Sequence, residues 1–153
     1  PKFEEIAVFP IIEAQIQLLK NVADGKNILI ENQILPEANV FADKNHLMII
    51  FRNLLQNAIK FTNSGGKITF NSLEKDERSI IEVKDNGIGM SEEKIKNLFH
   101  LEKNTFSSGT ANEQGTGLGL VLVKDLVEVN NGKIIVKSKL GEGTIFELSL
   151  PKA

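Results

Sequence analysis

The chain has 153 residues, which is enough for one domain with a hydrophobic core of its own. Its 18 basic and 20 acidic side chains give a net charge of -2, so no general positive field favours nucleic acid or an anionic membrane. The absence of cysteine excludes disulfides and thiolate chemistry, and no apolar run approaches the ~18 residues that would span a bilayer.

The first half of the chain predicts one helix, one strand and a second, longer helix. We expect residues 1–153 to form a single domain, with residues 1–10 as the remnant of a linker in a longer protein. Apolar residues at helical spacing predict a first helix over residues 11–23. NILIENQI predicts a strand, and NVFA a short extended stretch. Asp43 then stands where a helix cap belongs, before a helix that reaches Thr62.

The second half predicts two hairpins and two further helices. KITFNSL and SIIEVKD read as paired strands, and Ser91 caps a short helix. Residues 100–116 lack periodicity and predict a loop, before a helix from about Thr116 to Val129 and a closing hairpin. This order predicts an α/β (α+β) two-layer sandwich: a mixed, mostly antiparallel sheet of about five strands, with about three helices packed on one face.

A carboxylate ends the most apolar strand face. Ile81, Val83 and Asp85 alternate toward one side, and Gly87 and Gly89 follow at once. A carboxylate on an inward face can accept a hydrogen bond from the exocyclic amine of a ligand, and glycines let the backbone approach a flat ring. A simple turn around a solvated aspartate is the alternative.

Polar side chains also interrupt the apolar stripe of the long helix. The spacing of Leu47, Ile50 and Leu54 continues to Asn57 and Phe61. A buried asparagine is costly unless it has partners, so Asn57 either bonds to backbone in the core or faces a cavity and coordinates a ligand.

A third feature is the glycine-rich start of the helix near residue 116. Gly115, Gly117 and Gly119 expose backbone N–H groups at the positive end of the helix, which is an anion site and most naturally one for phosphate. A flexible turn is the alternative. Taken together, the three features predict one pocket for a purine nucleotide and Mg²⁺.

Five ordered motifs carry a family resemblance from about Val40 to Pro151. The chain resembles the catalytic, ATP-binding domain of the sensor histidine kinases of two-component systems, within the superfamily that includes gyrase-type ATPases and heat-shock chaperones and shares the Bergerat fold. The motifs are NLLQNAIKFT as the N box, DNGIGM as the G1 box, LFHLEK as the F box, GTGLGL as the G2 box, and GEGTIF as the last glycine motif.

The resemblance implies a role for each matching residue. Asn57 would bind Mg²⁺, Lys60 would contact phosphate and Phe61 would pack against the adenine, whose amine Asp85 would bind directly and through a water shared with Thr144. Gly87 and Gly89 would form the floor of the adenine pocket. Residues 100–116 would be the lid that covers the bound ATP. The phosphates would contact Gly115, Thr116, Gly117, Leu118 and Gly119. The family's F box usually has an arginine where this chain has Lys103, so the phosphate contact of Lys103 is left open.

Asn53 separates the kinases from the ATP-hydrolysing relatives. Those relatives carry a glutamate four residues before the metal-binding asparagine, and Asn53 cannot accept a proton near neutral pH. We therefore assign Asn53 and Lys60 to the catalytic positions of a domain that favours phosphotransfer over hydrolysis. Neither His46 nor His100 stands in the sequence setting of the family's phosphoacceptor.

The resemblance also implies partners and a location. The acceptor histidine would lie on a separate dimerisation domain of the parent kinase, with a cognate response regulator downstream and a cytoplasmic location. We expect the isolated domain to be a monomer that contacts neither nucleic acid nor membrane. A serine kinase of the anti-sigma type and a nucleotide-binding regulatory module without phosphotransfer are the alternatives.

Overall fold

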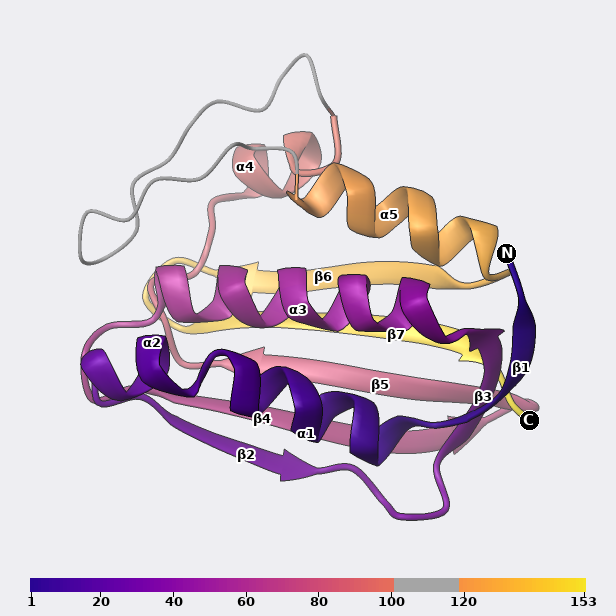
Figure 1. Ribbon diagram of the computed structural model, residues 1–153. Coiled ribbons are helices and arrows are strands. Elements are labelled where there is room, and N and C mark those ends of the chain that lie inside the picture. Colours follow the sequence, from indigo (N-terminus) through magenta and orange to yellow (C-terminus); the bar gives the residue numbers. More distant parts are fainter. Residues whose placement is uncertain (101–118) are drawn as a thin grey trace.

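The computed structural model describes residues 1–100 and 119–153, which form two layers, a sheet and the helices that cover one of its faces (Figure 1). The five-stranded sheet has the order β2-β4-β5-β7-β6. β2 and β4 are parallel and the other neighbours are antiparallel, so the predicted mixed sandwich is confirmed. The strands are β2 (Leu29–Gln33), β4 (Lys67–Lys75), β5 (Arg78–Asp85), β6 (Lys133–Lys139) and β7 (Gly143–Pro151).

Three helices, α1, α3 and α5, lie side by side over the sheet, with α3 in the middle (Figure 1). The Asp43 carboxylate caps α3 as predicted, because its Oδ1 accepts the His46 N–H at 3.0 Å. The predicted first helix is two helices, which begin earlier and break at Leu19, where the backbone leaves helical geometry (φ -103°, ψ 9°). The helices are α1 (Val8–Leu18), α2 (Lys20–Gly25), α3 (Lys44–Phe61), α4 (Glu92–Asn97) and α5 (Gly119–Val129).

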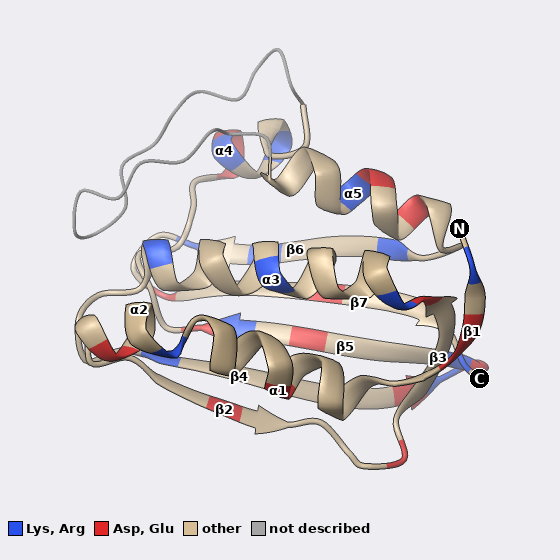
Figure 2. Cartoon of the chain, in the orientation of Figure 1, with Lys and Arg blue, Asp and Glu red and all other residues tan. Residues whose placement is uncertain are grey.

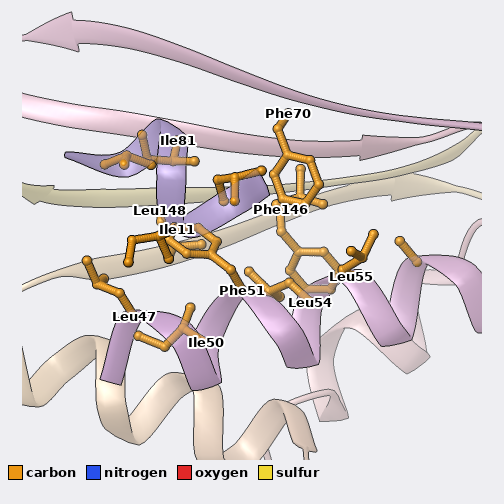
Figure 3. Packing of buried hydrophobic residues seen from close by; sticks show 14 of the residues in the cluster. Ile11, Leu47, Ile50, Phe51, Leu54, Leu55, Phe70, Ile81, Phe146 and Leu148 are labelled. Atoms are coloured by element: carbon orange, nitrogen blue, oxygen red, sulfur yellow. The ribbon is translucent and has the colours of Figure 1, made fainter. Parts of the chain in front are cut away.

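The core lies between α3 and the sheet (Figure 3). Phe51, Phe70 and Phe146 come from α3, β4 and β7, and each is buried. Leu54 and Leu148 fill the space around them. Burying a large apolar side chain contributes about 1.5–3 kcal/mol, so this cluster fixes the distance between α3 and the strands that end at the polar side chains described below.

The expectation of a linker remnant at residues 1–10 is corrected by the N-terminal strand. β1 (Phe3–Ala7) pairs antiparallel with β3 (Asn39–Asp43), and α1 begins directly after it. Ile6 and Val8 are buried in the main core, so this segment adds apolar burial as well as backbone pairing. The sequence did not reveal this pairing, because the partner strand is more than thirty residues away along the chain.

No helix within the described ranges is long and apolar enough to cross a membrane. The predictions for Lys103, Gly115, Thr116, Gly117 and Leu118 and for the lid beyond His100 lie outside the described residues.

Candidate functional site

Asp85 ends β5 in a buried position. It faces Thr144 of β7 in the strand register and is 6% exposed. Its Oδ1 accepts the N–H of Gly87 at 2.9 Å and the N–H of Thr144 at 3.2 Å. Burial raises the pKa of this carboxyl to about 6, against the opposing effect of those two hydrogen bonds. The predicted inward direction of the carboxylate is confirmed.

The two oxygens of Asp85 have different surroundings. Oδ1 is held by two backbone donors, whereas Oδ2 accepts no hydrogen bond from any residue in the described part of the chain. Asp85 and Thr144 line a cavity of about 400 Å³ at this end of the sheet, which Ile95 of α4 also lines. Oδ2 is not one of the fully enclosed side-chain oxygens that lack a partner, so a ligand in the cavity can bring an N–H group to it.

A hydroxyl pair beside Asp85 fixes the direction of the Thr144 side chain. Ser138 of β6 donates its only hydroxyl hydrogen to the Gly143 carbonyl at 2.8 Å and accepts the Met90 N–H at 2.8 Å. The 2.8 Å contact between the two hydroxyls must therefore carry the Thr144 hydrogen. The lone pairs of Thr144 stay available, as a shared water would require. Sequence analysis missed Ser138, which stands in a strand with no motif around it.

The two glycines after Asp85 make room for the protein's own backbone. A side chain at Gly87 would meet the carbonyl of Phe61, and one at Gly89 would meet the carbonyl of Lys139. Gly89 also has a φ of +70°, which favours glycine. The segment after β5 therefore packs between the end of α3 and the β6–β7 turn, and its role as an adenine floor stays a prediction.

The end of α3 adjoins this loop. Asn57, Lys60 and Phe61 are each half-buried there, and the Ile88 N–H donates to the Phe61 carbonyl at 3.0 Å. The side chain of Asn57 makes no hydrogen bond to another residue in the described ranges, which disagrees with a core amide bonded to backbone. A half-buried amide at a helix end can serve as a single ligand to a metal that keeps its other bonds to phosphate and water.

A buried lysine from a distant segment supports the same helix end. Lys26, which directly follows α2, is 8% exposed, and its Nζ donates to the carbonyls of Ile59 at 2.8 Å and Lys60 at 3.3 Å. These are last-turn carbonyls, which lack the usual partner four residues later in the helix and carry its negative dipole. The Ile59 carbonyl also accepts the N–H of the cap residue Thr62 at 3.4 Å. Sequence analysis missed Lys26, because a lone lysine after a helix gives no signal of burial.

Comparison with known proteins places this geometry in a family. The family described as histidine kinase-, DNA gyrase B-, and HSP90-like ATPase matches residues 42–153. The chain is 35% identical to sporulation kinase E of Bacillus subtilis over 97% of its own length, and it spans 20% of that protein. The chain belongs to this ATPase family.

Two solved structures support the assignment. The nucleotide-free catalytic domain of histidine kinase ThkA superimposes with a TM-score of 0.84 at 27% identity, covering 99% of this chain and 97% of that one. Full-length ShkA in complex with AMPPNP gives a TM-score of 0.82 at 26% identity, covering 99% of this chain and 31% of that one. The chain therefore shares the fold of the ThkA catalytic domain, and of part of ShkA, over nearly its whole length.

At the position where hydrolytic members of the ATPase family carry glutamate, Asn53 bonds to its own helix. Its Nδ2 donates to the Ile49 carbonyl at 2.7 Å. Its Oδ1 faces Gly119 at the start of α5, where an added side chain would lie 2.9 Å from it. The structure thus brings the N box helix to the last glycine of the G2 box, the part of that motif that lies in the described ranges.

Proposed function

We propose that this domain binds Mg·ATP and transfers the γ-phosphoryl group to a histidine on a separate dimerisation domain of a longer sensor kinase. The observation that carries the proposal is Asp85, which is buried at the end of β5 with Oδ1 held by backbone and Oδ2 without a donor from the described residues. Adenine has one exocyclic amine, and its N–H group matches that single acceptor.

The metal and phosphate part of the proposal rests on the end of α3. Among the described residues no three His, Asp, Glu or Cys side chains gather into a metal site. Mg²⁺ is often held by one or two protein oxygens together with substrate phosphates and waters, and Asn57 supplies such an oxygen. Lys60, one helical turn further on, adds a positive charge for the phosphate chain. These residues would position the nucleotide and neutralise its charge. Positioning and charge neutralisation are the main contributions of a protein to the catalysis of phosphoryl transfer.

Transfer rather than hydrolysis is supported by Asn53. An amide cannot take a proton from water near neutral pH, and this one is bonded to the Ile49 carbonyl. General-base catalysis typically contributes ~10²–10⁴-fold, so an attacking water would lack that help here. A separate acceptor domain is proposed because the chain spans only a fifth of sporulation kinase E. A response regulator is proposed as a partner because histidine kinase ThkA, which shares this fold, has been solved in complex with one.

A trans-labelling experiment tests the proposal. The domain is incubated with Mg·ATP labelled on the γ-phosphate, with and without the dimeric helical domain of its own parent protein. We expect label on the added domain that is labile in acid and stable in alkali, with little label or hydrolysis when the domain is alone. Rapid turnover by the domain alone would favour a gyrase-type ATPase, and acid-stable label on a partner serine would favour the anti-sigma type.

The metal role of Asn57 is tested separately. Asn57→Ala should weaken Mg·ATP binding in calorimetry while leaving adenosine binding nearly unchanged, because the amide is assigned to the metal and the phosphates. Gln56→Ala is the matched control, since Gln56 is the preceding residue of α3 and is exposed. If wild-type binding of ATP is indifferent to EDTA, the metal assignment is wrong.

A further inference from the structure

A second lysine, Lys94 of α4, reaches the aromatic ring at the end of α3. Its Nζ lies 4.4 Å from the centroid of the Phe61 ring, and the Nζ of Lys60 lies 4.9 Å from the same centroid. The two lysines come from different elements, and Figure 2 shows basic segments on α4 and at the end of α3. Two positive charges therefore converge on one half-buried ring.

This position has an electrostatic cost. A cation over an aromatic face is attracted by the electrons of the ring, but Lys94 is half-buried and shares the ring with the like charge of Lys60. Burial first, and Lys60 second, lower the pKa of the Lys94 ammonium. No carboxylate in the described part of the chain forms an ion pair with Lys94, although Glu92 and Glu93 precede it on α4.

The neighbouring lysine of the same helix behaves differently. Lys96 is exposed, as a lysine on a short surface helix normally is. Lys94 instead lies against Phe61, so α4 directs one of its lysines inward and one to solvent. An anion between the ammonium groups of Lys60 and Lys94 would offset both the desolvation and the mutual repulsion, and a polyphosphate chain offers several such oxygens.

We infer that Lys94 is a second cationic residue for the phosphate chain of the nucleotide, acting from α4 beside Lys60 of α3. The inference rests on the proposed function, since it names a further residue of the same site. It makes α4 part of the binding surface, whereas the sequence motifs place the phosphate contacts on α3 and on the glycine-rich segment. Sequence analysis missed Lys94 because a lysine between two glutamates and an isoleucine reads as part of a solvated helix face.

The test compares Lys94→Gln with the matched control Lys96→Gln by calorimetry with Mg·ATP and with adenosine. Loss of one charge-assisted contact should weaken ATP binding about tenfold in Lys94→Gln. Adenosine binding should be unchanged, the affinity for ATP should depend less on salt, and Lys96→Gln should resemble wild type. Lys94→Arg, which keeps the charge, should retain most of the ATP affinity. Thermal melts should show both glutamine variants folded, because neither removes an apolar contact of the core.

Three outcomes would overturn the inference. The first is an ATP affinity of Lys94→Gln equal to that of wild type. The second is an equal loss of affinity for adenosine, which would mean that Lys94 contacts the nucleoside rather than the phosphates. The third is equal affinity of wild type and Lys94→Gln for inorganic tripolyphosphate, because we expect the variant to bind this anion at least several-fold more weakly. A different result is that wild type fails to bind ATP and still binds tripolyphosphate in a way that depends on Lys94. That result would contradict the proposed function but would support an anion site at Lys94.

Discussion

Replacing Asp85 with asparagine should separate the stability of the domain from its nucleotide binding. In the structure Oδ1 holds the N–H groups of Gly87 and Thr144, and an asparagine Oδ1 can accept both in the same way. The amide nitrogen would then take the place of Oδ2. The variant keeps the internal hydrogen bonds of the buried group but turns the ligand-facing acceptor into a donor.

The stability change follows from the pKa of Asp85. This pKa rises from 3.8 to about 6 on burial. As pH rises from about 4 to 6, Asp85 loses its proton in the unfolded chain but keeps it in the folded protein. The free energy of unfolding therefore falls across that window and becomes constant above about pH 6. At 1.36 kcal/mol per pH unit, the shift corresponds to about 3 kcal/mol. Asp85→Asn cannot ionise, so it should be more stable than wild type at pH 7 by up to about that amount.

The binding change has the opposite sign. Loss of a charge-assisted hydrogen bond costs about 1.5–3 kcal/mol, which weakens Mg·ATP binding roughly ten- to a hundredfold. Wild-type affinity should itself fall as pH drops below about 6, because protonated Asp85 accepts less well. Calorimetry at pH 7.5 gives the affinities, and urea unfolding from pH 4 to 8 gives the stabilities.

The same substitution at an exposed site serves as control. Asp125→Asn on α5 should change neither the affinity nor the pH dependence of unfolding, since Asp125 is exposed. Unchanged ATP affinity in Asp85→Asn would refute the adenine assignment. A variant less stable than wild type at pH 7 would refute the view that burial of an ionised carboxylate costs the free protein stability.

Three other substitutions test the surroundings of the site. Lys26→Met should lower the free energy of unfolding by about 1–3 kcal/mol in urea titrations, because two helix-end carbonyls lose their buried donor; an unchanged midpoint would contradict the capping role. Gly89→Ala should unfold at lower temperature in calorimetric scans, since φ of +70° and the Lys139 carbonyl both oppose a side chain; a melting temperature equal to wild type would contradict this. Asn53→Glu should raise steady-state ATP hydrolysis in a phosphate-release assay by supplying a base, and hydrolysis no faster than wild type would show that more than the base is missing.

Local sequence patterns predicted the sheet, the long helix and the direction of the key carboxylate. Strand alternation has a period of two, so Ile81 and Val83 fixed the face on which Asp85 had to lie. The cap at Asp43 was readable because a capping side chain bonds to backbone three residues away. Each of these signals acts over a few neighbouring residues, which is the range over which a sequence can be read without knowing the fold.

Long-range contacts decided the rest. Lys26 reaches carbonyls 33 and 34 residues away, and Lys94 meets the ring of Phe61 from another helix. Ser138 directs the Thr144 hydroxyl from the edge strand, and β1 joins the fold through backbone pairing with β3. Motif residues identify the family because the ligand demands them, whereas these supporting side chains depend on which surfaces the core brings together. The sequence by itself determined where the nucleotide motifs lie and which way Asp85 points. Only the tertiary structure decided which oxygen of Asp85 is left for a ligand, because that depends on the donors that β7 and the following loop bring to it.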